Sequence, residues 1–502
     1  SASSAAAAGS APATAVRAAA GAAAGSAAAA AARRSRIREP WGTDPVSSGT
    51  NDTIAAISTP PGEGGVGIVR ISGPDAVQTA AALFVSPRGR SPLTHPRQRV
   101  FHGHIRDAAG RVVDEVLLHV MRAPRSYTRE DVVEINAHGG PAPLRAILEE
   151  ALRLGCRLAR PGEFTQRAFL NGRLDLVQAE AVIDRIRART DAALRAANAA
   201  ASGELSAEIH RLRDALADAL ARAEAAVDFP EEDLPELVDD AFFARLRDAA
   251  EGMRRLLDTA RAGRLYQEGA EIALIGRPNV GKSSLFNALL RDARAIVSPV
   301  PGTTRDVLGE QAQFGGVPVR LADTAGIRDA GDDIERQGVD LARRALRAAH
   351  VVVLVLDAVD GWTPGDRHLA DEAAGTVPVI VAANKTDLAP APAEGHGNLP
   401  PPLAVSAKTG AGLRELEDAL AAALLGGAAS REGGPQLTRL HQEDSLRRAL
   451  EDVERSLHAP EGAPECLAAD LRAALHALGE ITGETTPEDL LDRIFASFCI
   501  GK

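Results

Sequence analysis

A glycine-rich segment, residues 276–283, constrains the fold of this chain more than any other feature. It reads G-R-P-N-V-G-K-S, with a β-like run (residues 271–275) before it and a helix-like run (residues 284–290) after it. In a strand–loop–helix setting, glycines let backbone N–H groups face a phosphate, and the helix N-terminus adds positive potential. We therefore predict a phosphate-binding loop in which Lys282 reaches the β- and γ-phosphates and Ser283 ligates Mg²⁺. A glycine-rich turn without a ligand is the alternative.

Two further motifs follow strand-like runs in the same α/β segment and indicate the nucleotide. A run at residues 317–321 leads to Asp323, which we expect to organise Mg²⁺, and to Gly326, whose amide would sense the γ-phosphate. A run at residues 377–382 leads to Asp387, whose carboxylate can accept hydrogen bonds from guanine N1 and N2. Adenine offers no such pair of donors, and a site built for them is strongly selective. The chain is therefore predicted to bind GTP.

The predicted GTP site also includes a switch-like loop, residues 298–306, that should place one threonine on Mg²⁺. A Pro/Gly-rich surface turn is the alternative for that loop. The full set of predicted GTP-binding residues is Asn279, Val280, Gly281, Lys282, Ser283, Ser284, Ser298, Pro299, Val300, Pro301, Gly302, Thr303, Thr304, Asp323, Thr324, Ala325, Gly326, Asn384, Lys385, Asp387, Ser406, Ala407 and Lys408.

The residue after Gly326 bears on hydrolysis. Ras-like proteins carry a water-orienting glutamine there, whereas this chain has Ile327, which cannot polarise water. Hydrolysis therefore needs another polar group, and the nearby acidic segment, residues 329–335, supplies candidates that end at Glu335. A solvated acidic loop is the alternative interpretation of that segment.

Length and composition bound the rest of the chain. With 502 residues, 45% hydrophobic and 25% charged, it is too long for one ordinary domain and has ample material for globular cores. The net charge of −11 argues against a free-standing nucleic-acid binder, although a local basic patch or a basic partner would be compatible with it. Three cysteines match no metal site or disulfide framework. The apolar run at residues 351–356 is too short to span a bilayer, so we expect a soluble protein without membrane contact.

The N-terminal residues have a separate character. Residues 1–38 are rich in Ala and Ser, carry several arginines, and lack an acidic residue before Glu39. That composition is typical of an organellar transit peptide, so residues 1–50 are set apart from the fold. A low-complexity tail from a biased genome is the alternative, and the composition does not distinguish mitochondrion from chloroplast.

The pattern along the chain predicts a multidomain protein. Short β-like runs and one helix at residues 51–171 indicate a small α+β domain, and residues 172–268 show the period of long amphipathic helices. Residues 269–427 alternate strands and helices, and residues 428–502 are helical again. We expect an N-terminal α+β domain, a discontinuous α-helical domain, and an α/β P-loop GTPase domain inserted between its two halves.

With these motifs in view, residues 51–502 resemble the MnmE/TrmE family of tRNA-modification GTPases. The matching blocks are residues 52–54, 64–73, 130–135, 160–164, 168–172, 226–232 and 493–502, together with the GTPase motifs. The resemblance implies an N-terminal domain that forms a homodimer and binds a 5-formyltetrahydrofolate-type folate through Arg70, Glu134, Arg173 and Lys502. The family usually has Lys where Arg173 stands, so the charge is kept but the contact differs.

The resemblance also implies a potassium-activated hydrolysis. In the family, K⁺ beside the phosphates takes the place of an arginine finger, and the ligands fall on Asn279, Ser298, Val300 and Thr303. Thr304 then becomes the second Mg²⁺ ligand beside Ser283, and the catalytic glutamate falls on Glu335. The G domains of two subunits approach each other on activation.

The C-terminal tail reads as a helix followed by a short projecting end. Thr486 is predicted as its N-cap, and apolar residues from Leu490 to Phe498 as one anchoring face. In the family the end points toward the folate, and its cysteine, here Cys499, takes part in the modification chemistry. A small buried hydrophobe and a prenylated cysteine are the other two interpretations of Cys499.

The function implied by the resemblance is a GTPase acting with a flavoprotein of the MnmG (GidA) type. Together they install a carboxymethylaminomethyl-type group on C5 of the tRNA wobble uridine, and tRNA is contacted through the complex. An organellar ribosome-assembly GTPase or a regulatory GTPase without modification chemistry is the alternative.

Overall fold

The computed structural model describes most of the chain, which divides into two compact units. The described residues are 52–89, 91–94, 99–228, 238–292, 311–323, 348–375, 377–426, 434–459 and 464–502. The first unit runs to Arg167 and also contains Cys499–Lys502, and the second is Ala168–Phe498. The predicted domain limits at residues 171, 268 and 427 stay predictions.

The first unit is built on one mixed sheet. Among the described residues its seven strands follow the order β3-β4-β5-β6-β2-β1-β7. The strands are β1 (Ile54–Ile57), β2 (Gly64–Ser72), β3 (Phe84–Val85), β4 (Arg99–Arg106), β5 (Val112–Met121), β6 (Val132–Gly139) and β7 (Arg157–Leu158). All neighbours pair antiparallel except β1 and β7, which are parallel. The helical segments are α2 (Ala76–Leu83), η1 (Pro92–Thr94), α3 (Pro141–Arg153) and the start of α4 (Glu163–Leu170).

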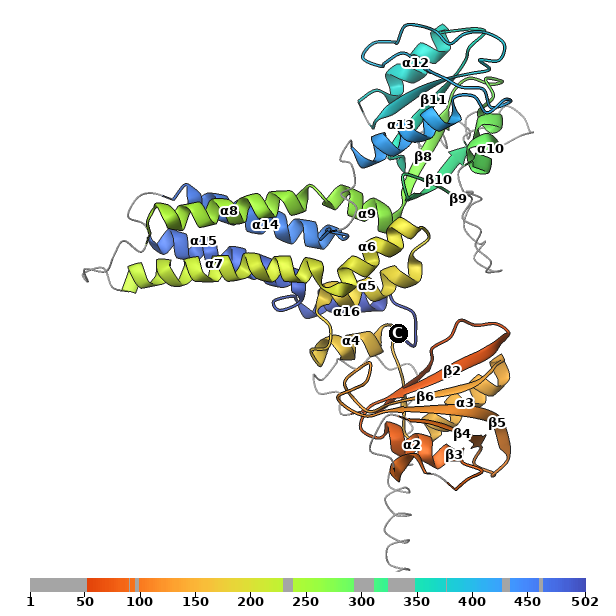
Figure 1. The fold of residues 1–502 in the computed structure, drawn as a ribbon, viewed down its shortest axis with the longest axis vertical. Helices are drawn as coiled ribbons and strands as arrows, with labels where there is room; N and C mark the ends of the chain where they lie inside the picture. The colour runs from red at the N-terminus through yellow and green to blue at the C-terminus, as the bar shows by residue number, and fades with distance from the viewer. Residues whose placement is uncertain are drawn as a thin grey trace, which may run out of the picture. The chain divides into compact units, whose positions relative to one another are not determined.

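One face of this sheet packs against α2 and α3, and the other is covered near β1, where Ile54 and Ala56 pack against Phe164 of α4, but is exposed at other strands. Alternate residues of the central strands, such as Val69, Leu118 and Ile135, form a single core with apolar residues of α2 and α3 (Figure 1). The intervening residues point to the opposite face. Val66 of β2 and Leu117 of β5 lie on that face and are 60% and 49% exposed, which is a high value for large apolar side chains in a sheet.

The helical part of the second unit has one core drawn from both ends of the chain. Buried residues between Val177 and Ala260 pack in the same cluster as buried residues between Leu437 and Ile481. The helices are α5 (Leu176–Arg187), α6 (Asp191–Ser202), α7 (Glu204–Asp228), α8 (Asp240–Leu257), α9 (Ala260–Glu268), α14 (Leu440–Leu457), α15 (Pro464–Thr482) and α16 (Glu488–Ala496). Figure 1 shows α7, α8, α14 and α15 running side by side. The prediction of a discontinuous helical domain is therefore confirmed.

Between these two halves lies an α/β domain with a doubly covered sheet. The six described strands follow the order β13-β12-β11-β8-β10-β9, and only β9 pairs antiparallel. Their bounds are β8 (Ala270–Ile275), β9 (Gln311–Phe314), β10 (Val317–Asp323), β11 (Val351–Asp357), β12 (Val379–Asn384) and β13 (Leu403–Ala404). Helices α10 (Lys282–Asp292) and α13 (Leu413–Leu425) cover one face, and α12 (Pro364–Ala373) covers the other. Burial from both sides explains why every residue of β11 is buried and apolar up to Asp357.

The start of the C-terminal helix differs from the sequence prediction. The N-cap of α16 is Pro487, with no side-chain cap bond. The Thr486 hydroxyl instead donates to the Glu480 carbonyl at 2.7 Å, so the prediction of Thr486 as cap is wrong. The cause is a contact with another helix, because a backbone carbonyl near the end of α15 accepts the hydrogen bond of this hydroxyl. The predicted anchoring is confirmed for Phe495 and Phe498, which are buried against α5.

Candidate nucleotide and C-terminal tail sites

The glycine-rich segment forms a tight loop between β8 and α10. Gly276 and Gly281 have φ of +149° and +90°, and Asn279 has φ of +62°. A Cβ on Gly276 would lie 2.4 Å from the Val355 carbonyl oxygen, so only glycine fits. The ammonium of Lys282 lies inside this loop and donates to the carbonyls of Gly276 and Arg277, each at 2.8 Å. The prediction of a strand–loop–helix phosphate loop is thus met by the backbone.

A buried asparagine ties this loop to the predicted guanine motifs. Asn384, at the end of β12, is 3% exposed. Its Nδ2 donates to the Val280 carbonyl at 3.0 Å, and its Oδ1 accepts from the Ala407 amide at 3.0 Å. Lys385 Nζ reaches back to the Asn279 carbonyl at 2.8 Å. Three segments far apart in sequence are therefore joined at the carboxyl edge of the sheet, where ligands bind in open α/β folds.

The predicted guanine acceptor is held in place at the same edge. Asp387 Oδ1 accepts from Ser406 Oγ at 2.8 Å, and Lys408 Nζ lies 3.9 Å from Asp387 Oδ2. The hydroxyl fixes the plane of the carboxylate, which suits it to accept two parallel hydrogen bonds. The structure therefore brings Asn384, Asp387 and Ser406 together beside the phosphate loop.

One residue at this edge was missed by the sequence reasoning. Asp357, the last residue of β11, accepts from Lys385 Nζ at 2.7 Å. Burial acts to raise the pKa of Asp357, but the hydrogen bond from Lys385 and a backbone N–H keep it below the usual value. The signal was present, because an apolar strand that ends in aspartate resembles the run ending at Asp323.

The remaining residues of the predicted GTP site fall into two groups. Ser283 and Ser284 lie in the first turn of α10, after Lys282, and Asp323 ends β10, where its backbone pairs with Leu274 of β8. The switch-loop and hydrolysis predictions lie outside the described residues, namely Ser298, Pro299, Val300, Pro301, Gly302, Thr303, Thr304, Thr324, Ala325, Gly326 and Glu335.

A second site lies in the first unit, where the chain end meets the sheet. Arg70 of β2 pairs with Glu134 of β6 at 2.8 Å, and its Nη1 donates to the Gly501 carbonyl at 2.8 Å. The Gly162 amide also donates to the Cys499 carbonyl at 3.3 Å. Three of the residues predicted to contact folate, Arg70, Glu134 and Lys502, are thereby gathered in one unit. Arg173 belongs to the second unit, in a polar pocket that His210 and Glu484 also line.

Two cationic side chains, Arg70 and Lys502, lie close enough at the tail site to influence each other. Burial lowers the pKa of Lys502, and the positive charge of Arg70 lowers it further, against the opposing effect of Glu134 and Cys499. The Arg70 guanidinium also lies over two aromatic rings, 5.6 Å from the Tyr127 centroid and 5.5 Å from that of Phe164. Cys499 is exposed, so its interpretation as a small buried hydrophobe is wrong.

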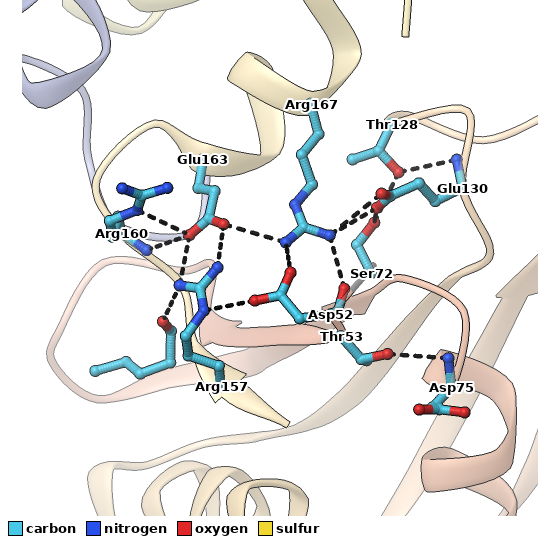
Figure 2. Close-up of polar contacts among 11 residues, drawn as sticks. Asp52, Thr53, Ser72, Asp75, Thr128, Glu130, Arg157, Arg160, Glu163 and Arg167 are labelled. Carbon is cyan, nitrogen blue, oxygen red and sulfur yellow. Dashed lines mark hydrogen bonds and ion pairs between the residues drawn. The ribbon is translucent and has the colours of Figure 1, made fainter. Parts of the chain in front are cut away.

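An ion network surrounds Arg167 and Glu163 of α4, the helix that also carries Phe164. Figure 2 shows the polar contacts of this network. Arg167, 1% exposed, donates to Asp52 Oδ1 at 2.6 Å, to Glu130 at 3.2 Å and to Glu163 Oε1 at 3.2 Å. Arg157 completes the network with a bond to Asp52 Oδ2 at 2.7 Å. Burial acts to raise the pKa of Glu163, but Arg157, a backbone amide and Arg167 hold it below 4.5. The sequence reasoning assigned no role to Arg167.

No helix in the described part of the chain is long and apolar enough to cross a membrane.

Comparisons with known proteins identify the family of the chain. Residues 53–173 match the family model "GTP-binding protein TrmE N-terminus", and residues 176–499 match "MnmE helical domain". The chain is 48% identical to the tRNA modification GTPase MnmE of Symbiobacterium thermophilum over 459 residues, which is 90% of this chain and 99% of that protein. The corresponding protein of Chloroflexus aurantiacus is also 48% identical, over 90% of this chain and all of its own length (100%).

A solved structure of Era from Aquifex aeolicus bound to GDP and AlF4⁻ is 27% identical, over 39% of this chain and 69% of that one, with a TM-score of 0.26. A score this low supports no structural inference. The sequence matches establish the family, because together they extend from the N-terminal sheet to the C-terminal tail. This chain therefore belongs to the MnmE (TrmE) family of tRNA-modification GTPases.

Proposed function

We propose that this protein hydrolyses GTP as one half of a complex that modifies the tRNA wobble uridine. Its partner would be a flavoprotein of the MnmG (GidA) type, and the product a carboxymethylaminomethyl-type group on C5. A formylated tetrahydrofolate would supply the one-carbon unit. The GTPase would drive domain motion, and tRNA would be contacted through the complex.

The observation that carries this proposal is the docking of the chain end in the first unit. Arg70 contacts Gly501 across 431 residues of sequence, so the tail bearing Cys499 ends beside Arg70 and Glu134. A protein that served only as a GTP switch would have no need to bring an exposed cysteine to a cationic, aromatic-lined position distant in sequence from its nucleotide site. This arrangement favours modification chemistry over the ribosome-assembly and regulatory alternatives.

The chemistry of this donor set suits a folate. A folate carries anionic carboxylates and a flat heterocycle with N–H donors. Arg70 and Lys502 supply positive charge, Glu134 supplies a carboxylate acceptor, and Tyr127 and Phe164 supply aromatic surface. We propose that Arg70, Glu134 and Lys502 hold the folate, with Arg173 as a fourth contact. Cys499 would act in the modification chemistry.

We further propose that hydrolysis depends on K⁺ and Mg²⁺. Ser283 and Thr304 would ligate Mg²⁺, and Asn279, Ser298, Val300 and Thr303 would ligate K⁺, with Glu335 as the catalytic glutamate. Support from the described residues comes from Asn279, which is exposed at the loop surface while its carbonyl is held by Lys385. A monovalent cation near the phosphates would neutralise charge that develops in the transition state.

The cation proposal has a direct test. Single-turnover GTP hydrolysis should be much faster in KCl than in NaCl, and Asn279→Ala should erase that difference. The same variant should still bind GTP, because the Asn279 contact to Lys385 uses only the backbone. Equal rates in both salts would remove the potassium mechanism and leave the GTPase assignment intact.

A homodimer through the first unit is also part of the proposal. On the sheet face opposite α2 and α3, Val66, Val100 and Leu117 are 48–60% exposed. Large apolar side chains in one sheet face are normally covered, and a second copy of this unit would cover them. Analytical ultracentrifugation of Leu117→Glu should show a weakened dimer if this face is the interface.

For the compartment, we propose an organelle, mitochondrion or chloroplast, on the composition of residues 1–38 alone. Those residues lie outside the described part, and the relatives named above are bacterial and give this proposal no support.

Nucleoside mass spectrometry on tRNA tests the function as a whole. In cells that depend on this protein, Arg70→Ala and Cys499→Ser should each lose the C5-modified wobble uridine while purified protein retains its GTPase rate. Both residues belong to the first unit, whereas the glycine-rich loop belongs to the second. Unchanged modification with either variant would refute the enzymatic proposal and favour a ribosome-assembly or regulatory role.

A further inference from the structure

A hairpin of two helices carries an unusual local excess of positive charge. Residues 185–198, from the end of α5 into α6, contain four arginines and one acidic residue, Asp191, in a chain with a net charge of −11. Three of these arginines, Arg185, Arg189 and Arg195, define what we call the α5–α6 basic face. All three are exposed.

The geometry brings the three side chains to one part of the hairpin. Arg185 Nε donates to Asn198 Oδ1 at 2.8 Å, so this face of α5 meets the face of α6 that carries Asn198. Arg195 lies three residues before Asn198, and thus one turn nearer the connection on the same face of α6. Arg189 lies in that connection. The fourth arginine, Arg187, points elsewhere and donates to the Ser497 carbonyl at 2.6 Å.

The basic face differs from the other arginine clusters of the helical core. Arg211, Arg254 and Arg472 each pair with a glutamate at 2.7 Å or less. Within the described part of the chain, Arg185, Arg189 and Arg195 have no acidic partner. Like charges gathered without counter-charges repel one another, so their grouping raises the free energy of the isolated fold slightly and suits an anionic partner.

Helix electrostatics account for only one of the three. A cation in the last turn of a helix is favoured by the macrodipole, which explains Arg185 at the end of α5. Arg189 and Arg195 flank the first turn of α6, where a cation is disfavoured. Arg189 and Arg195 therefore do not stabilise α6 through its helix dipole.

The chemistry of the face fits phosphate groups better than an acidic protein surface. Arginine offers a planar fork that binds phosphate oxygens in pairs. Stable protein interfaces need a buried apolar core, often aromatic, and here the large apolar neighbours are only Ile186 and Leu194, 48% and 41% exposed. Binding to a phosphate backbone needs no such core.

We propose that the α5–α6 basic face directly contacts the phosphate backbone of the tRNA substrate. The proposal rests on the proposed tRNA-modifying function and goes beyond it, since it gives this chain its own RNA surface in addition to that of the flavoprotein. It also reconciles the acidic chain with an RNA substrate, because the positive charge is local.

The test is RNA binding by the full-length protein as a function of salt. The probe is an unmodified, fluorescein-labelled tRNA transcript followed by fluorescence anisotropy, without nucleotide, from about 50 to about 200 mM salt. Replacing Arg185, Arg189 and Arg195 by Gln should weaken binding at least about tenfold at the lowest salt. The slope of log Kd against log salt should fall by about 2 to 3, because each of the three lost phosphate contacts accounts for about 0.7–0.9 of that slope.

The matched control removes the same charge from dispersed positions. Arg88, in the turn after β3, Arg247 of α8 and Arg414 of α13 are exposed and pair with no acidic side chain in the described residues. Their triple Gln variant should change neither affinity nor slope beyond a small uniform effect. Equal losses in both variants would mean a general charge effect and overturn the proposal, as would unchanged binding in the basic-face variant.

Two further outcomes separate the possible failures. If wild-type protein binds no tRNA, and the basic-face variant instead loses affinity for the flavoprotein partner, the face is a protein-docking surface and the proposal is wrong. If tRNA binding behaves as expected but the wobble uridine stays modified in every variant and in a deletion of the protein, the proposed modification function fails while the RNA surface stands.

Discussion

The docking of the chain end makes a quantitative prediction at a single glycine. Gly501 has φ of +90°, and a Cβ there would lie 2.6 Å from the Ile57 carbonyl oxygen and 2.7 Å from Ser58 Cα. Both neighbours are backbone atoms of the end of β1 and the residue after it, so neither can move aside as a flexible side chain would. The Arg70 bond to the Gly501 carbonyl depends on this same conformation.

The magnitude for Gly501→Ala follows from two terms. A side chain in the left-handed region costs about 1–2 kcal/mol, and forcing an extra methyl against packed atoms costs about 1–3 kcal/mol. The sum, about 2–5 kcal/mol, corresponds to at least an approximately 30-fold shift toward an undocked tail. Because Gly501 is one residue from the chain end, this cost releases the tail and leaves the rest of the unit folded.

The assay combines ligand binding with thiol labelling. Gly501→Ala should lower the affinity for 5-formyltetrahydrofolate at least about tenfold and speed the alkylation of Cys499, at an unchanged GTP hydrolysis rate. Gly110→Ala is the control, since Gly110 has φ of +78° with no atom within 4 Å of its added Cβ. That control should cost a little stability and leave folate affinity unchanged. Wild-type affinity and labelling in Gly501→Ala would refute the docked tail as the basis of the site.

Three other predictions follow from the contacts described. Asp387→Asn should weaken GTP binding at least about 100-fold and create binding of xanthosine triphosphate, whose base has a carbonyl in place of the guanine amino group. Nucleotide competition measures both affinities. Asn384→Ala should destabilise the nucleotide domain by about 1–3 kcal/mol in urea unfolding, because the buried partners at Val280 and Ala407 lose their bonds. Arg167→Met should destabilise the first unit by about 3–5 kcal/mol, since Glu163 is left buried beside fewer cations. The pKa of Glu163 in the folded protein lies below its ordinary 4.5, so Glu163 stabilises the wild type fully above that pH, and this stability is lost as the pH falls. Arg167→Met should therefore lose less stability on acidification than the wild type, and Arg88→Met is the control. An acid-unfolding profile of Arg167→Met equal to that of the wild type would contradict the network.

Much of the nucleotide site was predictable because its chemistry is local. A phosphate loop needs specific backbone conformations within eight residues, and glycine at Gly276 and Gly281 reports them directly. The strand that precedes Asn384 packs on both faces, so it reads as a continuous apolar run. Parallel strands place their carboxyl ends at one edge, so the meeting of these motifs followed from their order.

The rest could not be read from periodicity. The helix pattern of residues 486–498 indicated an apolar face but not which neighbours Thr486 would find, and its hydroxyl bonds to Glu480. The same limit applies to Arg167, whose type suggests a solvated surface and whose position is 1% exposed among three carboxylates. Charge alone does not tell whether an arginine is buried, because that depends on partners supplied by distant segments.

The sequence by itself predicted the glycine-rich loop between a strand and a helix, and the division into sheet-bearing and helical parts; Asp387 as the guanine acceptor stays a prediction. Tertiary structure alone decided that Asn384 joins the loop to Ala407, and that Arg70 donates a hydrogen bond to the carbonyl of Gly501, 431 residues away. The physical reason is that local sequence sets backbone conformation and which face of an element is apolar. Which two faces then meet is decided by packing the whole chain, where burial and hydrogen bonding of remote residues are satisfied together.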